Sequence, residues 1–377
     1  MKNLIKKLNR IFQGYMREKR LKIGKYIWDR KDKVKILEGN GFLEENDIKS
    51  ILFLRYDGKI GDMVVNSLMF REIKKVYPDI KIGVVARGAA IDIIKDNPNV
   101  DKIYEYYKDR KKIKDLALKI KEEKYDLLID FSEMLRVNQM MLINLCGARI
   151  NIGLDRKDWK LFDLSIESGK DFKWTEHITN RYLAYLIKIG LKKESINISY
   201  DIYLKDEIKY EDFFNEIKES KKLILNPYGA SKHKSFNIEN LENIITYLKD
   251  KDIAIILVYF GDKYKELEFL EKKYKYVYIP KKIESILDTA ILIKKSDYII
   301  SPDTSIVHIA SAFNKKMITI YPPKGGKYGV DHLVWEPKSK YNKVIFCKDK
   351  TGNYDEIDIN TFDFDEMKEE ILKMLEQ

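Results

Sequence analysis

Three small polar residues and a histidine follow a short apolar run near residue 300, in the stretch Ser301–Ala310 (SPDTSIVHIA). Asp303, Thr304 and Ser305 are typical of the start of a helix. His308 comes three residues after Ser305 and four after Thr304, so these three side chains share one helix face. The free N–H groups and the dipole at a helix start also favour an anion. The stretch therefore predicts either a capped helix with a buried histidine or an anion site made of these residues.

A second candidate is the loop at residues 55–62 (RYDGKIGD), which follows another apolar run. Asp62 is placed to begin a helix, and we interpret it either as an N-cap or as a general base. Asp57 is the second candidate for a base, although it could instead hold the loop by pairing with Arg55 or Lys59. A carboxylate at either position suits chemistry that takes a proton from a hydroxyl group.

Gly58 and Gly61 in the same loop allow the backbone to turn tightly. Their spacing matches neither the dinucleotide-binding fingerprint nor the phosphate loop of ATPases, which requires Gly-Lys-Ser/Thr. The loop therefore disfavours both a dehydrogenase and an ATPase.

The loop at residues 226–236 (NPYGASKHKSF) combines small residues with cations. Small residues such as Ser231 allow close approach of the backbone, and Lys232, His233 and Lys234 suit an anion. This composition favours phosphate binding over a merely solvated basic loop.

A fourth loop, residues 260–266 (FGDKYKE), carries two carboxylates. Asp262 and Glu266 could accept ribose hydroxyls, or could simply mark the start of a helix. Together with the two preceding anion candidates, the loop suits a nucleotide diphosphate.

Strands and helices alternate along the chain, which is the pattern of parallel β-α-β units in a doubly wound sheet. The alternation restarts after the charged segment 192–221, so we expect an α/β protein with two Rossmann-like halves that face a central cleft. In such sheets ligands bind outside the carboxyl ends of the strands, where the candidate loops lie. Strands are predicted at 51–54, 80–85, 125–130, 223–226, 253–258, 276–279, 298–300 and 317–321, with helices at 62–76 and 177–191.

The expected organisation is a basic arm at 1–45, a first half at 46–205, a second half at 206–350 and a C-terminal helix within 351–377. The amphipathic segment Phe364–Leu375 could pack back across the halves onto the first one. Asp363 and Asp365 at its start resemble a metal-binding pair, but helix capping is the favoured interpretation.

Composition excludes several classes of protein. The chain has 377 residues, 45% of them hydrophobic, which is enough for two ordinary domains. Cys146 and Cys347 form neither a disulfide framework nor a metal-ligand spacing, and the histidines are scattered. No apolar run approaches the roughly 20 residues of a membrane-spanning helix. We expect a soluble, cytoplasmic protein.

Nearly all of the net charge of +11 belongs to the N-terminal arm, because residues 1–35 hold 13 Lys/Arg and 3 Asp/Glu. Apolar residues recur there at helical spacing between basic ones, which predicts a helix on an anionic membrane surface. A helix packed on its own protein is the alternative. Nucleic-acid binding is disfavoured, since the rest of the chain shows no basic stripe. The apolar residues are Leu4, Leu8, Ile11, Phe12 and Tyr15, and the basic ones Lys6, Lys7 and Arg10.

Over about residues 51–323 the chain resembles glycosyltransferase family 9, the ADP-heptose:lipopolysaccharide heptosyltransferases. Each matching piece is weak alone, but their order and spacing are specific. The pieces are residues 51–62, 125–130, 147–153 (GARINIG), 181–183 (RYL), 226–231 with Lys234, and 301–308.

The resemblance implies a GT-B fold, with the acceptor in the first half and the sugar nucleotide in the second. It also implies inversion at the anomeric carbon, with no cofactor and no essential metal. The general base falls on Asp62, and the acceptor side on Gly58, Lys59 and Gly61. The donor nucleotide is expected at Ser231, Lys234, Asp262, Glu266, Asp303, Thr304, Ser305 and His308.

The chain departs from the family pattern in two places. Ser305 stands where many members have glycine, and Asn226-Pro-Tyr stands where His-Pro-Gly is frequent. The implied donor is ADP-heptose and the implied acceptor a lipid A–core, reached at the inner face of the cytoplasmic membrane through residues 1–35. The alternatives are transfer of another sugar to a surface glycan and a non-catalytic module that binds nucleotide sugars.

In the expected reaction Asp62 takes the proton of an acceptor hydroxyl as the new bond forms. The charge of the leaving diphosphate would be stabilised by Lys234, by the backbone N–H groups of residues 304 and 305, and by His308, protonated or as a neutral donor.

Overall fold

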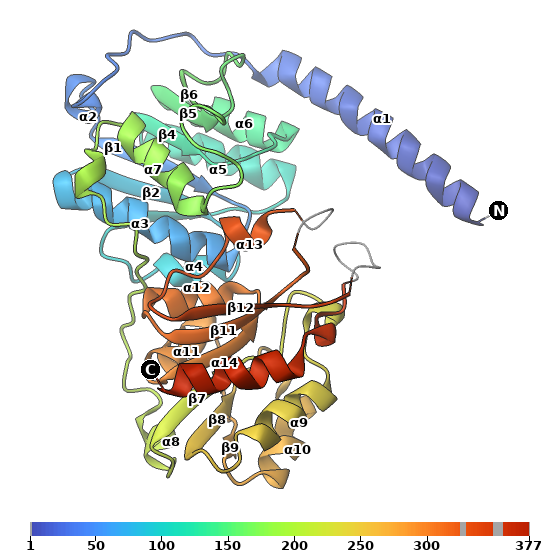
Figure 1. The fold of residues 1–377 in the computed structure, drawn as a ribbon. Helices are drawn as coiled ribbons and strands as arrows, with labels where there is room; N and C mark the ends of the chain where they lie inside the picture. The colour runs from blue at the N-terminus through green and yellow to red at the C-terminus, as the bar shows by residue number, and fades with distance from the viewer. Residues whose placement is uncertain (1, 325–328, 350–356, 377) are drawn as a thin grey trace.

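The computed structural model describes residues 2–324, 329–349 and 357–376, although no side chain is described for residues 2–8, 10 and 11. The predicted boundary at residue 350 lies outside this part of the chain. The described residues form two six-stranded parallel sheets, one in each half of the molecule (Figure 1). Helices α3 (Ile60–Val76) and α12 (Ser305–Ala312) lie between the two sheets and pack against each other.

The first sheet has the strand order β3-β2-β1-β4-β5-β6. Its central strands read as continuous apolar runs, because both faces of a parallel sheet are covered by helices. The strands are β1 (Ser50–Arg55), β2 (Lys81–Ala86), β3 (Lys102–Glu105), β4 (Leu127–Asp130), β5 (Ile150–Leu154) and β6 (Leu164–Ile166). The helices besides α3 are α2 (Phe42–Glu45), α4 (Ala90–Ile94), α5 (Arg110–Glu122), α6 (Val137–Cys146) and α7 (Ile178–Lys188).

The second sheet has the order β12-β11-β10-β7-β8-β9. The strands are β7 (Lys221–Leu225), β8 (Ile253–Leu257), β9 (Val277–Tyr278), β10 (Tyr298–Pro302), β11 (Lys316–Tyr321) and β12 (Asn342–Phe346). The helices besides α12 are α8 (Glu211–Asn215), η2 (Lys232–Lys234), α9 (Ile238–Tyr247), α10 (Tyr264–Lys273), α11 (Ile286–Lys294), α13 (Asp331–Val334) and α14 (Phe364–Glu376). All the predicted strands are confirmed, whereas β3, β5, β6 and β12 were not predicted.

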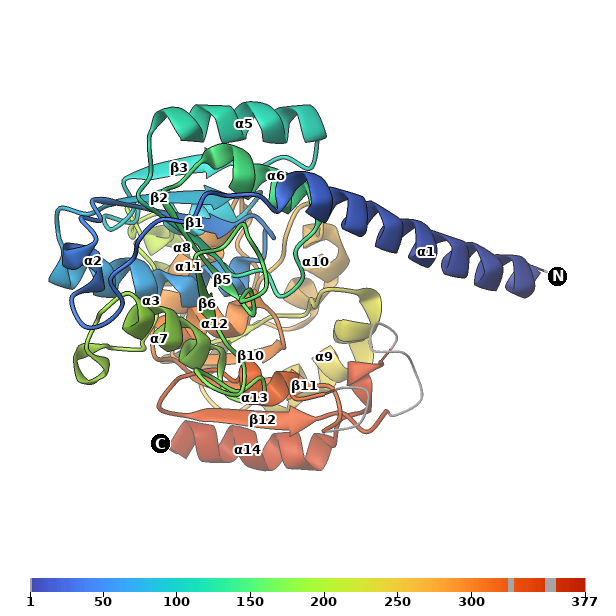
Figure 2. The same cartoon turned by 90° about the horizontal axis from the view of Figure 1, so that it is seen from above.

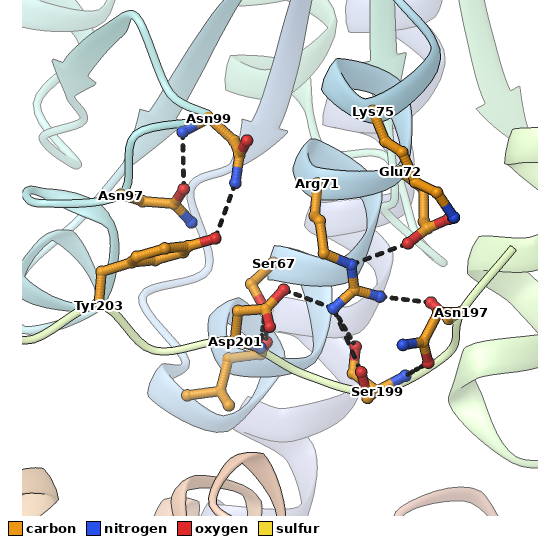
Figure 3. Close-up of polar contacts among 11 residues, drawn as sticks. Ser67, Arg71, Glu72, Lys75, Asn97, Asn99, Asn197, Ser199, Asp201 and Tyr203 are labelled. Carbon is orange, nitrogen blue, oxygen red and sulfur yellow. Dashed lines mark hydrogen bonds and ion pairs between the residues drawn. The ribbon is translucent and has the colours of Figure 1, made fainter.

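The segment that connects the halves crosses α3 and is held there by Arg71 (Figure 3). The Arg71 guanidinium donates to the carbonyl oxygens of Asn197 and Ser199 and pairs with Asp201. The backbone N–H of Asp201 in turn donates to Ser67 Oγ over 2.8 Å. These bonds hold the connection along the helix that separates the two sheets.

The C-terminal helix α14 packs on strands β11 and β12. Its buried residues Met367, Ile371 and Met374 belong to the apolar core of the second half. The expectation that it packs back onto the first half is therefore wrong. The capping interpretation of Asp363 is confirmed, because its carboxylate accepts the backbone N–H of Asp365 at 3.0 Å.

Helix α1 (Lys2–Trp28) extends away from the rest of the molecule (Figures 1 and 2). Its last turns pack on α6, where a Cβ at Gly24 would lie 2.6 Å from Val137. The helix is thus anchored at one end and projects at the other. Among the described helices, none has the length and apolarity needed to cross a bilayer.

Candidate active site

A cavity of about 890 Å³ opens at the carboxyl ends of the first five strands of the first half. The loops after β1, β2, β3 and β4 form most of its wall, and α7 closes one side. The second half contributes Asp331 and Trp335, from α13 and the residue after it. The cavity therefore lies in the half that was expected to hold the acceptor.

Asp62 lies in this cavity wall, in the first turn of α3. Its carboxylate is 2.7 Å from the buried Arg55 guanidinium, which also lies 3.4 Å from Asp57. The N-cap position is occupied by Lys59, so the interpretation of Asp62 as an N-cap is wrong. Asp57 instead shapes the turn, because its Oδ1 accepts the backbone N–H of Lys59 over 3.1 Å.

The electrostatic surroundings of Asp62 suit a proton acceptor. Burial raises the pKa of Asp62, while the positive charge of Arg55 opposes that rise. A raised pKa makes a carboxylate a stronger base, and the ion pair fixes its orientation. The side chain keeps an exposed fraction of 16%, which leaves it open to the cavity.

Five further cations line the cavity. Arg181 pairs with Glu133, and the other four each come from a different loop or strand end: Lys59, Arg87, Lys108 and Arg136. Arg87 donates to the carbonyl oxygen of Asp57 over 2.9 Å. None of the four forms an ion pair with a carboxylate in the part of the chain that the structure describes. Arg87, Lys108 and Arg136 were not singled out from the sequence, although all three follow predicted or observed strands of one sheet.

The expected donor residues gather at the carboxyl ends of β7, β8 and β10, which are neighbours in the second sheet. Asn226 connects two of these loops, because its Nδ2 donates to Ser301 Oγ over 2.9 Å. Tyr228 reaches the third, where its hydroxyl donates to Glu266 over 3.4 Å. Asp262 and Glu266 are both exposed, just before and within the first turn of α10.

The loop after β7 is closely folded around Lys234. A Cβ at Gly229 would lie 1.8 Å from the carbonyl oxygen of Lys234, so only glycine allows this path of the backbone. Ser231 precedes the short helix η2, and its hydroxyl is buried with no hydrogen-bond partner among the described residues. Lys234 lies close enough to Asp303 for its charge to lower the pKa of that carboxyl.

The start of α12 is capped as predicted, since Thr304 Oγ1 accepts the backbone N–H of Ile306 over 3.3 Å. Burial raises the pKa of Asp303 to about 6, although Tyr321 and Lys234 act in the opposite direction. Burial also lowers the pKa of His308 to about 3, with a further contribution from His177. Burial therefore favours the neutral form of His308 over the protonated one.

His308 also lies directly against the first half of the molecule. A Cβ at Gly61 would be 2.6 Å from His308 Cδ2. The next residue along α3 is Asp62, whose carboxylate pairs with Arg55 in the first half. The structure thus packs Gly61 against α12, but none of the eight described donor candidates lines the large cavity itself.

The two Rossmann-like halves have the GT-B arrangement, which is typical of one large class of glycosyltransferases. The family model described as "Glycosyltransferase family 9 (heptosyltransferase)" matches residues 113–345, and the chain belongs to this family.

Individual relatives agree with this assignment. The chain is 24% identical over 337 residues to lipopolysaccharide heptosyltransferase 1 of Campylobacter coli, covering 84% of this chain and 96% of the relative. It shares its fold with the family 9 glycosyltransferase of Veillonella parvula (TM-score 0.72, 14% identity, 87% and 98% of the two chains). It shares the same fold with the heptosyltransferase WaaC of E. coli with ADP (TM-score 0.66, 15% identity, 86% and 99%).

Proposed function

We propose that this glycosyltransferase moves a heptose from ADP-heptose to the inner core of lipopolysaccharide or lipooligosaccharide, with Asp62 as the general base. The observation that carries the proposal is the partly buried carboxylate of Asp62, held by Arg55 in the wall of a cation-lined cavity. The names of the relatives, which are lipopolysaccharide heptosyltransferases, support the choice of donor and acceptor.

The arrangement suits a single displacement that inverts the anomeric carbon. The acceptor hydroxyl attacks from the side of Asp62, and the diphosphate leaves on the side of the second half. Lys234 and the N–H groups at the start of α12 then stabilise the leaving group, and neutral His308 contributes no charge. This division of tasks needs no metal ion and no cofactor.

The cations of the first half support an acceptor that carries several negative charges. Lys59, Arg87, Lys108 and Arg136 surround one cavity and form no salt bridge with a carboxylate among the described residues, although the charge of Lys59 also acts on Asp62. Phosphates or sugar carboxylates of a lipid A–core would supply the missing anions.

The proposal is tested by incubating the protein with ADP-heptose and a heptose-deficient core acceptor, alongside a panel of other sugar nucleotides. We expect ADP release and an acceptor one heptose heavier, measured by mass spectrometry, only when both substrates are present. Faster transfer from another sugar nucleotide would support the neighbouring activity on a surface glycan. Donor binding by calorimetry with no transfer from any donor would instead support a non-catalytic binding module.

We also propose that α1 holds the enzyme on the anionic inner face of the cytoplasmic membrane. Phe12, Tyr15, Ile23 and Tyr26 recur at helical spacing, and Phe12 and Tyr26 are 62% and 76% exposed. They lie on the face opposite Gly24, which contacts α6. An exposed apolar face flanked by basic residues is the pattern of a helix that lies in a membrane surface.

Replacing Phe12 and Ile23 together by glutamate is expected to weaken binding to anionic vesicles by roughly 100-fold. Each side chain contributes about 1.5 kcal/mol or more when it enters the bilayer. Co-sedimentation with vesicles containing phosphatidylglycerol measures the change. The matched control is Ile208→Glu, because Ile208 is equally exposed (68%) but lies in the connection between the halves. Unchanged vesicle binding in the double variant would contradict the proposal.

A further inference from the structure

Gly61 is a glycine that its own backbone conformation does not require. It is the second residue of α3, and its φ is not in the left-handed region. Glycine inside a helix costs about 1 kcal/mol relative to alanine. The reason for glycine here is space, because a Cβ would lie 2.6 Å from His308 Cδ2 and 3.4 Å from its Nε2.

The His308 ring that fills this space is also held by two aromatic rings. The ring of Tyr200, in the connection between the halves, lies edge-on at 6.3 Å between centroids. The ring of Trp335, the residue after α13, also lies edge-on to the imidazole, with 5.8 Å between the ring centroids. His308 itself is buried and neutral, and its Nδ1 has no hydrogen-bond partner among the described residues. The imidazole thus acts here as a rigid packing group.

We infer that the contact between Gly61 and His308 sets the spacing between the base and the leaving group. Gly61 immediately precedes Asp62, and His308 lies one turn after Thr304 and Ser305 on α12. Because α3 and α12 form the main contact between the halves, a shift at this contact moves the carboxylate relative to the diphosphate site. Gly61 and His308 are therefore positioning residues, and the inference rests on the proposed function.

The size of the effect follows from the geometry. An added methyl at 2.6 Å must move to an ordinary contact of 3.4 Å or more, so the helices must separate by about 1 Å. A misplacement of that size costs roughly 100-fold in the rate of a reaction between held groups. Gly61→Ala is expected to lower kcat by about 100-fold while the KM for the donor changes less than about threefold, since the donor loops all lie in the second half.

The decisive experiment is a double-mutant cycle of Gly61→Ala and His308→Ala. Removing the imidazole makes room for the methyl group, so Gly61→Ala should cost less than about threefold in kcat in the His308→Ala background. The cycle measures the interaction between the two substitutions, so its result does not depend on what His308 itself contributes to donor binding. An equal loss of kcat in both backgrounds, or a Gly61→Ala variant with the kcat of the parent, would overturn the inference.

Two readouts keep the test independent of activity and of folding. The melting temperature of the double variant should be higher than the sum of the two single-variant shifts in melting temperature predicts. A crystal structure of Gly61→Ala should show α3 displaced from α12. If Gly61→Ala does not fold, the double variant should; a double variant that also fails to fold refutes the inference. Absence of transfer by the parent protein would refute the proposed function but leave these two readouts valid.

Gly169→Ala serves as the stability control. Gly169 has a φ of +79° and no atom within 4 Å of an added Cβ, so alanine strains the backbone without displacing a helix. This variant should melt at a lower temperature and retain the kcat of the parent.

Discussion

Replacing Asp62 by asparagine is expected to lower kcat by roughly 10²–10⁴-fold, because the amide cannot accept the proton of the acceptor hydroxyl. Asparagine has nearly the same shape, so the cavity wall is kept. Arg55 loses one carboxylate partner but retains Asp57 at 3.4 Å, which limits the loss of stability. Single-turnover rates at saturating donor and acceptor measure the effect. Donor affinity by calorimetry should stay unchanged, since Asp62 lies in the first half.

The pH dependence gives an independent check on the same residue. The base is active only when ionised, so the rate of the parent enzyme should rise as the pH increases through the pKa of Asp62. Because burial raises that pKa, the rate should increase at a pH above the usual pKa range of an exposed aspartate. The Asp62→Asn variant should lack this limb of the profile.

Asp57→Asn is the matched control for the choice of base. The Asp57 side chain is more exposed than that of Asp62, at 35% against 16%, and its Oδ1 shapes the turn at Lys59. The kcat of Asp57→Asn is expected to fall by less than about tenfold, since Asp57 is not the proton acceptor in the proposed reaction. If kcat falls severely in Asp57→Asn and only mildly in Asp62→Asn, then Asp57 is the base.

The second large effect is expected from Gly229→Ala, which should weaken ADP binding by roughly 10–100-fold. The added Cβ would lie 1.8 Å from the carbonyl oxygen of Lys234 and must displace that segment. The backbone N–H of Lys234 donates to the carbonyl oxygen of Ser231, and Ser235 Oγ donates to that same oxygen of Ser231. Breaking this fold would move the Lys234 ammonium away from the phosphate position that we propose.

Calorimetric titration with ADP measures the change, and thermal unfolding should shift little because the loop lies at the surface. Gly169→Ala again serves as the comparison, since it strains the backbone in the first half, whereas the donor loops lie in the second half. An ADP affinity of Gly229→Ala equal to that of the parent would show that Lys234 is not positioned by this loop.

Part of the fold was predictable because burial leaves a local pattern. Strands such as β1, β8 and β11 are covered on both faces, so they read as continuous apolar runs. The short strand β5 contains the polar Asn151, and β12 begins Asn-Lys, so neither presents such a run. The amphipathic pattern of α14 predicted a helix with one buried face, but it could not indicate which sheet covers that face.

The sequence by itself determined which residues are candidates for chemistry. Asp62, Lys234 and the turn at Thr304 became candidates because polar side chains follow strands at the edge of a parallel sheet where ligands bind. Only the tertiary structure decided that burial keeps His308 neutral and that its ring packs on Gly61. It alone brought Arg87, Lys108 and Arg136 to one cavity, because strands distant in the chain become neighbours only when the sheet forms. Burial and proximity between separate segments are properties of the folded chain, and no local pattern of residues encodes them.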